Sequence, residues 1–204
     1  MAKQLVPYDF DYFFNMKTVF EMGAFNCVTG KTDYFSSAQM QSEDEILDGL
    51  IATSSLPFIS KPVAIGEQVY LDGGISDAIP AERAFALGYE RLVIILSQDA
   101  SYRKSAMKMD LACRIACYKY PQVYQALRQR HENYNSSLAK IAQWEKEGRV
   151  FVIRPSEPVA ISRLEQDLVK VQQCYDDGTQ AAQVNWQALR TWLNETTEQV
   201  FEAG

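Results

Sequence analysis

An aliphatic run without interruption, residues 92–96 (Leu-Val-Ile-Ile-Leu), constrains the fold of this chain more than any other feature. Such a run is typical of a strand that is covered on both faces, as in a parallel sheet. Before it come a short extended stretch at residues 68–71 and a helix pattern at residues 78–87, which has a proline in its first turn and a glycine just past its end. The order strand, turn, helix, strand predicts an α/β fold in which Leu71 and residues 92–96 lie in one parallel sheet.

Shorter patterns predict the other elements. Two β-forming stretches around a glycine-containing turn predict a hairpin within residues 19–35, and a Gly-Glu turn joins extended residues 63–65 to residues 68–71. Ser42 followed by Glu45 is a capping-box pattern for a helix that ends near Thr53. The remainder is expected to be mainly helical: residues 107–120, residues 121–147, a strand at 150–153, and then two helices, of which the first begins at a capping box of Ser162 and Glu165.

Composition excludes some classes of protein. With 204 residues, 47% of them hydrophobic, the chain can bury an ordinary core, and a net charge of -6 argues against a nucleic-acid partner. The four cysteines form no Cys-x-x-Cys pair, so we expect buried, reduced thiols. No apolar stretch approaches the about 18 residues that span a bilayer, so we expect no transmembrane segment and a cytoplasmic protein.

Two signals that suggest chemistry fail on spacing or context. Gly30-Lys31-Thr32 looks like the end of a phosphate-binding loop, but Phe25 occupies the position where that motif needs its first glycine. The single histidine, His131, lies in a polar stretch of expected helix and has no metal-ligand pattern beside it. We therefore expect a hairpin turn, a solvated histidine, and no metal or cofactor.

The triplet Asp72-Gly73-Gly74 is the strongest candidate for a site. It follows a short expected strand and precedes a helix, and the carboxyl ends of strands are where open α/β sheets place catalytic groups. The two glycines would allow a tight turn and a close approach by a partner. Asp-Gly is also among the commonest turn dipeptides, so the local pattern alone favours a simple connection over a catalytic site.

Two ordered stretches surround this triplet. Residues 51–57 read Ile-Ala-Thr-Ser-Ser-Leu-Pro, and residues 69–80 read Val-Tyr-Leu-Asp-Gly-Gly-Ile-Ser-Asp-Ala-Ile-Pro. Together they resemble the second half of the catalytic domain of patatin-like phospholipases, in a bacterial branch of that family. The resemblance is strongest over residues 20–97. It implies part of a three-layer, parallel-sheet domain in residues 1–100, followed by a mainly helical region with one short strand in residues 101–204.

The resemblance also implies a chemistry, that of a serine acyl hydrolase acting on lipid esters through a Ser-Asp dyad. Asp72 matches the aspartate that serves as general base, and Gly73 and Gly74 support its turn. The family's glycine-rich oxyanion loop and Gly-x-Ser-x-Gly elbow precede the matched region and are absent here, as is an asparagine that many members carry at Ala78. We therefore expect this chain to be the C-terminal part of such an enzyme, truncated and inactive by itself.

Other residues are assigned ordinary roles. Ser54 and Ser55 have no elbow glycines beside them, so we expect a local capping or packing role rather than nucleophilic chemistry. Four tyrosines near Lys119, Arg128 and Arg130 could contact lipid headgroups at a membrane surface, although a solvated helix face with ordinary core aromatics fits the pattern better. These tyrosines are Tyr118, Tyr120, Tyr124 and Tyr134.

Three interpretations remain open at this stage. The first is part of an active lipid acyl hydrolase, the second a non-catalytic lipid-binding or interaction module with the same fold, and the third an unrelated α/β protein in which Asp72 only turns the chain. A sheet without its upstream strands would present unpaired edges, so we also expect the chain to self-associate.

Overall fold

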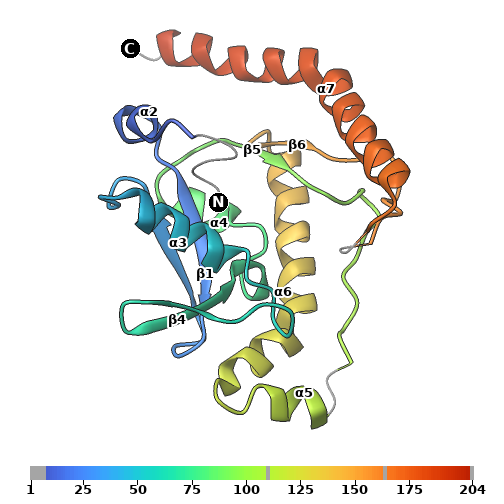
Figure 1. The fold of residues 1–204 in the computed structure, drawn as a ribbon. Helices are drawn as coiled ribbons and strands as arrows, with labels where there is room; N and C mark the ends of the chain where they lie inside the picture. Colours follow the sequence, from blue (N-terminus) through green and yellow to red (C-terminus); the bar gives the residue numbers. More distant parts are fainter. Residues whose placement is uncertain (1–7, 109–110, 163–164, 203–204) are drawn as a thin grey trace. The chain divides into compact units, whose positions relative to one another are not determined.

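The computed structural model describes residues 8–108, 111–162 and 165–202, and it is a mixed α/β protein with a mainly helical C-terminal region (Figure 1). The chain divides into two compact units. The first unit comprises residues Met1–Pro80 and Ser105–Tyr134, and the second comprises residues Ala81–Lys104 and Asn135–Gly204. The expected α/β class, with a parallel sheet and a mainly helical C-terminal region, is confirmed.

The first unit is built on a four-stranded sheet with the strand order β2-β1-β4-β3. Its strands are β1 (Glu21–Asn26), β2 (Thr32–Ser36), β3 (Val63–Ile65) and β4 (Gln68–Asp72), and every pair is antiparallel. The expected hairpin is confirmed, and so is the turn between β3 and β4, in which Gly66 has φ 59°.

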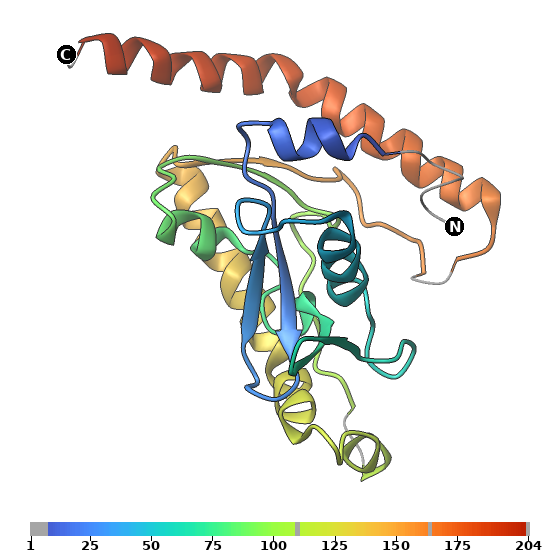
Figure 2. The same ribbon diagram turned by 60° about the vertical axis from the view of Figure 1, so that its left-hand side comes forward.

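One face of this sheet is covered by α3 (Glu43–Thr53) (Figure 2). The helix begins where the capping box predicts, because the hydroxyl of Ser42 accepts a hydrogen bond from the Glu45 amide at 3.3 Å. Ala52 then packs against Ala24 and Tyr70 in a buried cluster. Small residues at the contact let the helix lie close to the sheet.

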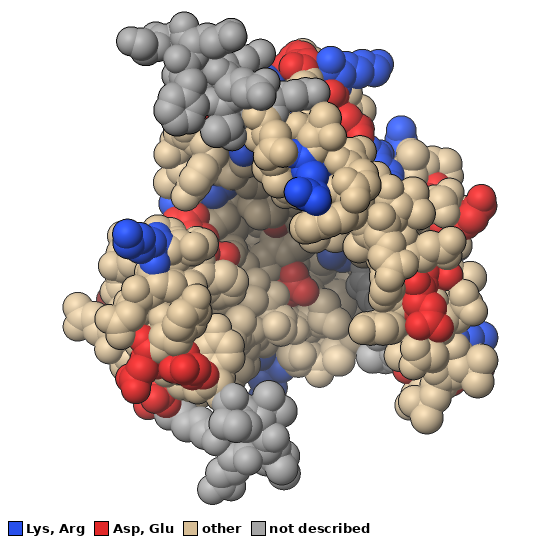
Figure 3. All heavy atoms as spheres, turned by 90° about the horizontal axis from the view of Figure 1, so that it is seen from above, with Lys and Arg blue, Asp and Glu red and all other residues tan. Residues whose placement is uncertain are grey.

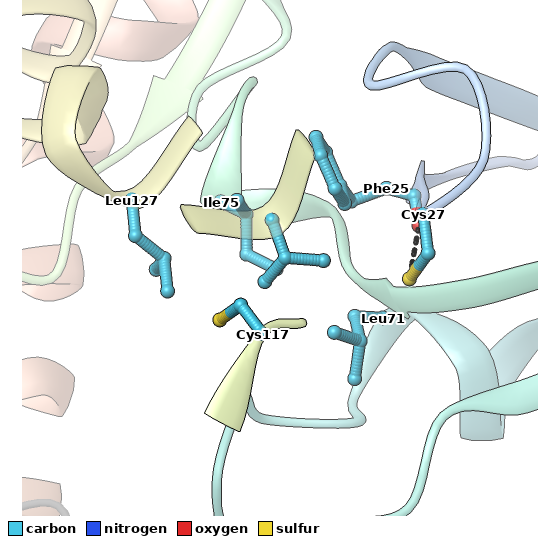
Figure 4. Packing of buried hydrophobic residues seen from close by; sticks show 7 residues of the cluster. Phe25, Cys27, Leu71, Ile75, Cys117 and Leu127 are labelled. Atoms are coloured by element: carbon cyan, nitrogen blue, oxygen red, sulfur yellow. Dashed lines mark hydrogen bonds between the residues drawn. The ribbon is translucent and has the colours of Figure 1, made fainter. Parts of the chain in front are cut away.

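The opposite face of the sheet carries the larger core (Figure 4). Phe25 and Leu71 from the strands, with Cys27 just past the end of β1 and with Ile75, pack against the turn that follows α5 (Leu111–Ala116) and against the first half of α6 (Pro121–Lys146). The contributing buried residues on the helical side are Cys117, Val123 and Leu127. The first unit therefore has three layers, with helix on both faces of an antiparallel sheet.

The prediction that Leu71 and residues 92–96 share a sheet is wrong. β4 lies in the four-stranded sheet, whereas β5 (Leu92–Ile95) pairs in parallel with β6 (Val150–Ile153) in a separate sheet. A two-residue turn can join only antiparallel strands, so the Gly-Glu turn makes β3 pair with one edge of β4. Because β1 pairs with the other edge, no edge of β4 is left for residues 92–96. The expectation that residues 92–96 are covered on both faces is also wrong in this structure, because Val93 and Ile95 are 43% and 78% exposed.

The second unit combines this small parallel sheet with helices. The crossover from β5 to β6 is long and includes α6, as parallel pairing requires. The unit also contains α4 (Ala81–Ala86) and α7 (Leu168–Glu202). Trp192 of α7 contacts this unit through its indole N–H, which donates to the carbonyl of Gly148 at 3.1 Å, and through the guanidinium of Arg91, which stacks 3.5 Å from its ring.

Several helix boundaries differ from the sequence predictions. α4 and α5 are each six residues long and shorter than expected, and α2 (Phe10–Asn15) was not predicted. A single long α7 replaces the two helices expected after β6. Part of the predicted start at Ser162 lies outside the described residues, and α7 begins instead after Asp167, whose carboxylate accepts from the Val169 amide at 2.9 Å. Within the described ranges, no helix combines the length and apolar character needed to cross a membrane.

Candidate active site around Asp72

Asp72 occupies the last position of β4, where its side chain is half-buried. Its carboxylate caps the short 3₁₀ helix η1 (Gly73–Ile75), with Oδ1 accepting a hydrogen bond from the Gly74 amide at 2.7 Å. The Asp72 amide in turn donates to the carbonyl of Ser55 at 2.8 Å. The Gly74 amide thus holds the carboxylate, and Ser55 holds the Asp72 backbone, at the strand end that the sequence predicted.

Position 73 requires a glycine because two backbone segments approach each other very closely there. A Cβ at this position would lie 2.2 Å from the carbonyl oxygen of Gly23 in β1, which is far inside van der Waals contact. That same oxygen accepts a hydrogen bond from the Thr53 hydroxyl at 2.6 Å, so α3 fixes its position. A Cβ at Gly74 would meet Oδ1 of Asp72 at 2.9 Å, so this glycine leaves room for the carboxylate.

The strand β2 supports the loop that follows η1. The hydroxyl of Tyr34 donates to the carboxylate of Asp77, and the hydroxyls of Thr32 and Ser76 are 2.5 Å apart. Both contacts cross over Gly23, because Tyr34 and Thr32 each lie 3.2 Å from where its Cβ would be. The loop after Asp72 is therefore fixed to the sheet at two further points.

Helix α6 provides the remaining support. Nε of Arg130 donates to the carbonyl of Gly74 at 2.6 Å, across 56 positions of sequence. Nη2 of the same guanidinium lies 3.5 Å from the point that a Gly74 Cβ would occupy. A positive charge is therefore part of the surroundings of the Asp72 turn.

A polar network lies inside the same sheet. The buried Asn26 accepts from the Val28 and Thr29 amides through Oδ1 and donates through Nδ2 to Asp33 and to Gln68. The Tyr70 hydroxyl also donates to Asp33, at 3.0 Å. Burial, together with the Asp33 carboxylate, raises the pKa of Tyr70 to about 12. This phenol remains neutral at physiological pH and acts as a hydrogen-bond donor within the sheet.

The other sequence candidates have local roles. The hydroxyls of Ser54 and Ser55 each donate to the backbone carbonyl four residues earlier, at 2.7 Å, which confirms the expected capping role. Gly30 has φ 74° in the turn between β1 and β2, as a hairpin requires. Nδ1 of His131 lies 3.0 Å from the carbonyl of Arg128 on its own helix.

The aromatic residues near α6 serve mainly the core. Tyr120 and Tyr124 pack against the buried cluster of the first unit, while Tyr118 is 82% exposed.

Among the described residues, no group of three or more His, Cys, Asp or Glu side chains could hold a metal ion. Acidic and basic side chains occur in small groups of both signs on the face drawn in Figure 3.

The thiols are free, and two of them are buried. Cys27 and Cys117 belong to the main core of the first unit, while Cys113 and Cys174 are partly exposed. Burial raises the pKa of Cys27 to about 11, and it also raises that of Cys117. Both are therefore neutral thiols that pack as small apolar groups.

Comparison with known proteins identifies the segment that builds this site. The model of the patatin-like phospholipase family matches residues 16–85, which include all four strands of the first unit, α3 and the Asp72 turn. A second model, described as a domain of unknown function (DUF6363), matches residues 120–194. Residues 16–85 are thus similar to the patatin-like phospholipase family, and the resemblance seen in the sequence is confirmed over this segment.

A bacterial protein is similar to part of this chain. The uncharacterized protein YjjU of Escherichia coli (strain K12) is 37% identical over 70 residues, which are 34% of this chain. The matched stretch covers 20% of YjjU, about one fifth of that protein's length.

Sequence reasoning found Asp72 and its two glycines but not their neighbours. The close approach of Gly23 involves a residue in a separate strand, and nothing in the local sequence marks it. Arg130 was noted only as one of several basic residues near tyrosines. Both contacts arise from tertiary packing between distant segments, so local motifs in a single sequence could not reveal them.

Proposed function

We propose that this chain supplies the general base of a lipid acyl hydrolase, and that Asp72 is that base. The observation that carries the proposal is the setting of its carboxylate, which is half-buried at a strand end with Oδ1 fixed by the Gly74 amide at 2.7 Å. The match of residues 16–85 to the patatin-like phospholipase family supports it.

The chemistry needs a serine from a segment that carries a Gly-x-Ser-x-Gly elbow, which these 204 residues do not contain. In the proposed reaction, Asp72 accepts the proton of that serine hydroxyl while its oxygen bonds to the ester carbonyl carbon. The ester C–O bond then breaks, and the departing alcohol takes the proton from Asp72. Water then repeats the cycle: Asp72 accepts a proton from water while the water oxygen bonds to the acyl carbon. The bond between that carbon and the serine oxygen breaks, the serine oxygen takes the proton from Asp72, and the carboxylic acid is released.

Pre-organisation explains why the turn is so tightly held. A general base must stay within hydrogen-bond reach of the proton that it accepts, and small displacements reduce the rate strongly. Contacts from three sources hold the Asp72 turn: Gly23 of β1, Ser55 at the end of α3, and Arg130 of α6.

The test is turnover of a short-chain ester by a full-length protein in which an elbow-containing segment precedes this chain. Asp72→Asn keeps the size of the side chain and an oxygen for the Gly74 amide but removes the proton acceptor, so kcat should fall about a hundredfold or more. The melting temperature should change little. The isolated chain should show no turnover, since the nucleophile is absent.

Asp77→Asn is the matched control, because it changes a carboxylate five positions later in the same loop. Asp77 accepts a hydrogen bond from the Tyr34 hydroxyl, and asparagine keeps an oxygen that can accept it, so this variant should hold the loop in place and keep most of its activity. An unchanged rate in Asp72→Asn, in a protein shown to be active, would remove the catalytic role of Asp72. Lipid binding without any turnover in the full-length protein would favour a non-catalytic lipid-binding module instead.

The sheet edges support a further part of the proposal, self-association of the isolated chain. β2 and β3 are the outer strands of the four-stranded sheet, and edge strands can pair with another chain. Sedimentation velocity over a wide concentration range should therefore show a species larger than the monomer. A stable monomer at high concentration would contradict this.

A further inference from the structure

Arg130 is placed to act on the Asp72 turn from a different part of the chain. Its Nε–H donates to the carbonyl of Gly74 at 2.6 Å, one peptide unit from the amide that holds the Asp72 carboxylate. Nη2 of Arg130 and Oδ1 of Asp72 both lie within 3.5 Å of the point that a Gly74 Cβ would occupy. The guanidinium and the carboxylate thus border the same small space.

The helix that carries Arg130 is fixed against the same turn. Val123 and Leu127 of α6 are 4% and 2% exposed, and they pack in one cluster with Leu71 and Ile75, which flank the Asp72 turn. Leu127 and Arg130 are three positions apart and so lie on neighbouring parts of one helix face. The apolar contacts therefore set the distance at which the Arg130 side chain reaches Gly74.

An arginine suits this position better than a lysine. Its planar guanidinium presents several N–H donors in a fixed geometry, so one edge can bond a carbonyl while another nitrogen stays close to a carboxylate. Lysine has one flexible ammonium, which can reach either group but does not fix their relative orientation.

We infer that Arg130 is a positioning residue for the proposed base, so that the region matching DUF6363 completes the Asp72 site. This inference rests on the proposed function of Asp72. In it, Arg130 holds the carbonyl of Gly74 and thereby the orientation of the amide that bonds Oδ1. It neither bonds to substrate nor transfers a proton.

The first experiment needs no catalytic activity. Amide hydrogen exchange is measured by NMR on this chain as wild type, as Arg130→Met and as the control Arg128→Met, which changes an exposed arginine two positions away on the same helix. In Arg130→Met, protection of the Gly74 amide should fall by about tenfold or more, while the amides paired between β1 and β4 keep theirs. Arg128→Met should leave the Gly74 amide unchanged.

The second experiment uses the full-length protein with an elbow-containing segment. Below its melting temperature, Arg130→Met should lower kcat by about tenfold with little change in KM, since a misplaced base slows chemistry rather than binding. Arg130→Lys keeps a donor for the Gly74 carbonyl and should recover part of that loss. Arg128→Met should match wild type.

These outcomes separate this inference from the proposed function. If Asp72→Asn abolishes turnover but Arg130→Met keeps both kcat and Gly74 protection, the inference is overturned and the proposed function stands. If Arg130→Met lowers Gly74 protection but Asp72→Asn leaves the rate intact, the contact is structural, which overturns the positioning role together with the catalytic one. A loss of kcat that follows only the fraction unfolded also overturns it.

Discussion

The internal contacts of the first unit differ in kind from those of the second unit. In the first unit, backbone meets backbone, since Gly73 lies directly against the carbonyl of Gly23. In the second unit, large side chains make the contacts. Trp192 packs on Arg91. Phe85 contacts the guanidinium of Arg149, 4.3 Å from its ring, and the ring of Trp144, 4.7 Å away.

This difference means that the first unit fixes the geometry of the Asp72 turn, whereas the second unit mainly buries side-chain surface. Contacts between backbones tolerate displacements of only a few tenths of an ångström, which is the tolerance that a catalytic carboxylate needs. Long side chains can adjust their rotamers and keep most of their contact area. Substitutions that add a single methyl group should therefore harm the first unit, whereas the second should respond mainly to the loss of large side chains.

Gly73→Ala should have the largest effect. The added Cβ would lie 2.2 Å from the carbonyl oxygen of Gly23, and neither backbone can move without disturbing the sheet. We expect a loss of about 4 kcal/mol in the free energy of unfolding, or a failure to fold. Urea denaturation followed by circular dichroism measures this.

Gly66→Ala is the control for Gly73→Ala. Gly66 has φ 59° and nothing within 4 Å of its Cβ position, so only backbone strain of about 1 kcal/mol should appear. Equal costs at the two positions would mean that the close approach at Gly73 does not limit packing in the first unit.

Trp192→Ala tests the second unit and should have the next largest effect. The substitution removes the stacking contact with the guanidinium of Arg91 and the hydrogen bond to the Gly148 carbonyl, together with a ring contact to Phe151 at 5.8 Å. A loss of about 2 to 3 kcal/mol is expected, measured by thermal denaturation. Trp186→Ala is the matched control on the same helix, since that ring is 54% exposed and its loss should cost little.

The sequence predicted elements that depend on local signals. The capping residue Ser42, the hairpin turn at Gly30 and the short turn between β3 and β4 were all located from a few neighbouring residues. Pairing between distant strands was not predicted, because a run such as residues 92–96 shows that a strand forms but not which strand it joins. The start of α7 was misplaced, since Ser162 and Asp167 both precede helix-forming residues and only the structure shows that Asp167 is the cap.

The candidate site likewise combines residues that a local motif marks with residues that only the fold brings together. Asp72 and its glycines are contiguous, so a motif identifies them. Arg130 and Gly23 contact them from elsewhere in the chain, and such contacts become visible only when the fold is known. Hydrogen bonds within the sheet, such as those of Asn26, were missed for the same reason.

Alkaline pH should weaken the first unit through two buried groups. The pKa of Cys27 is raised from 9.0 to about 11, first by burial, and that of Tyr70 from 10.0 to about 12. Because each folded pKa is above its unfolded value, the stability from these groups is complete below pH 9 and is lost as pH rises toward 12. A decrease of roughly 2 to 3 kcal/mol for each group is expected over this range.

Two substitutions test which group causes which part of this pH dependence. Cys27→Ala should flatten the lower part of the decrease and Tyr70→Phe the upper part, each measured as the slope of unfolding free energy against pH. A profile that is unchanged in both variants would place the alkaline titration outside the core of the first unit.

Gly178→Ala should have the smallest effect, and it should be stabilising. Gly178 lies exposed within α7 and has nothing within 4 Å of its Cβ position, so alanine adds no clash. Alanine is favoured over glycine in a helix interior by about 1 kcal/mol, because glycine loses more conformational entropy on folding. The melting temperature should therefore rise by a few degrees.

Gly148→Ala completes this comparison within the second unit. Gly148 has equally open space around it, but its φ is 74°, so alanine there should cost about 1 kcal/mol in backbone strain. The two glycines differ in backbone conformation and not in packing, and opposite signs for the two substitutions would show that conformation alone decides the outcome in this unit. A destabilising Gly178→Ala would instead mean that α7 is packed closely at this point, as Gly73 is in the first unit, and the contrast between the units would be lost there.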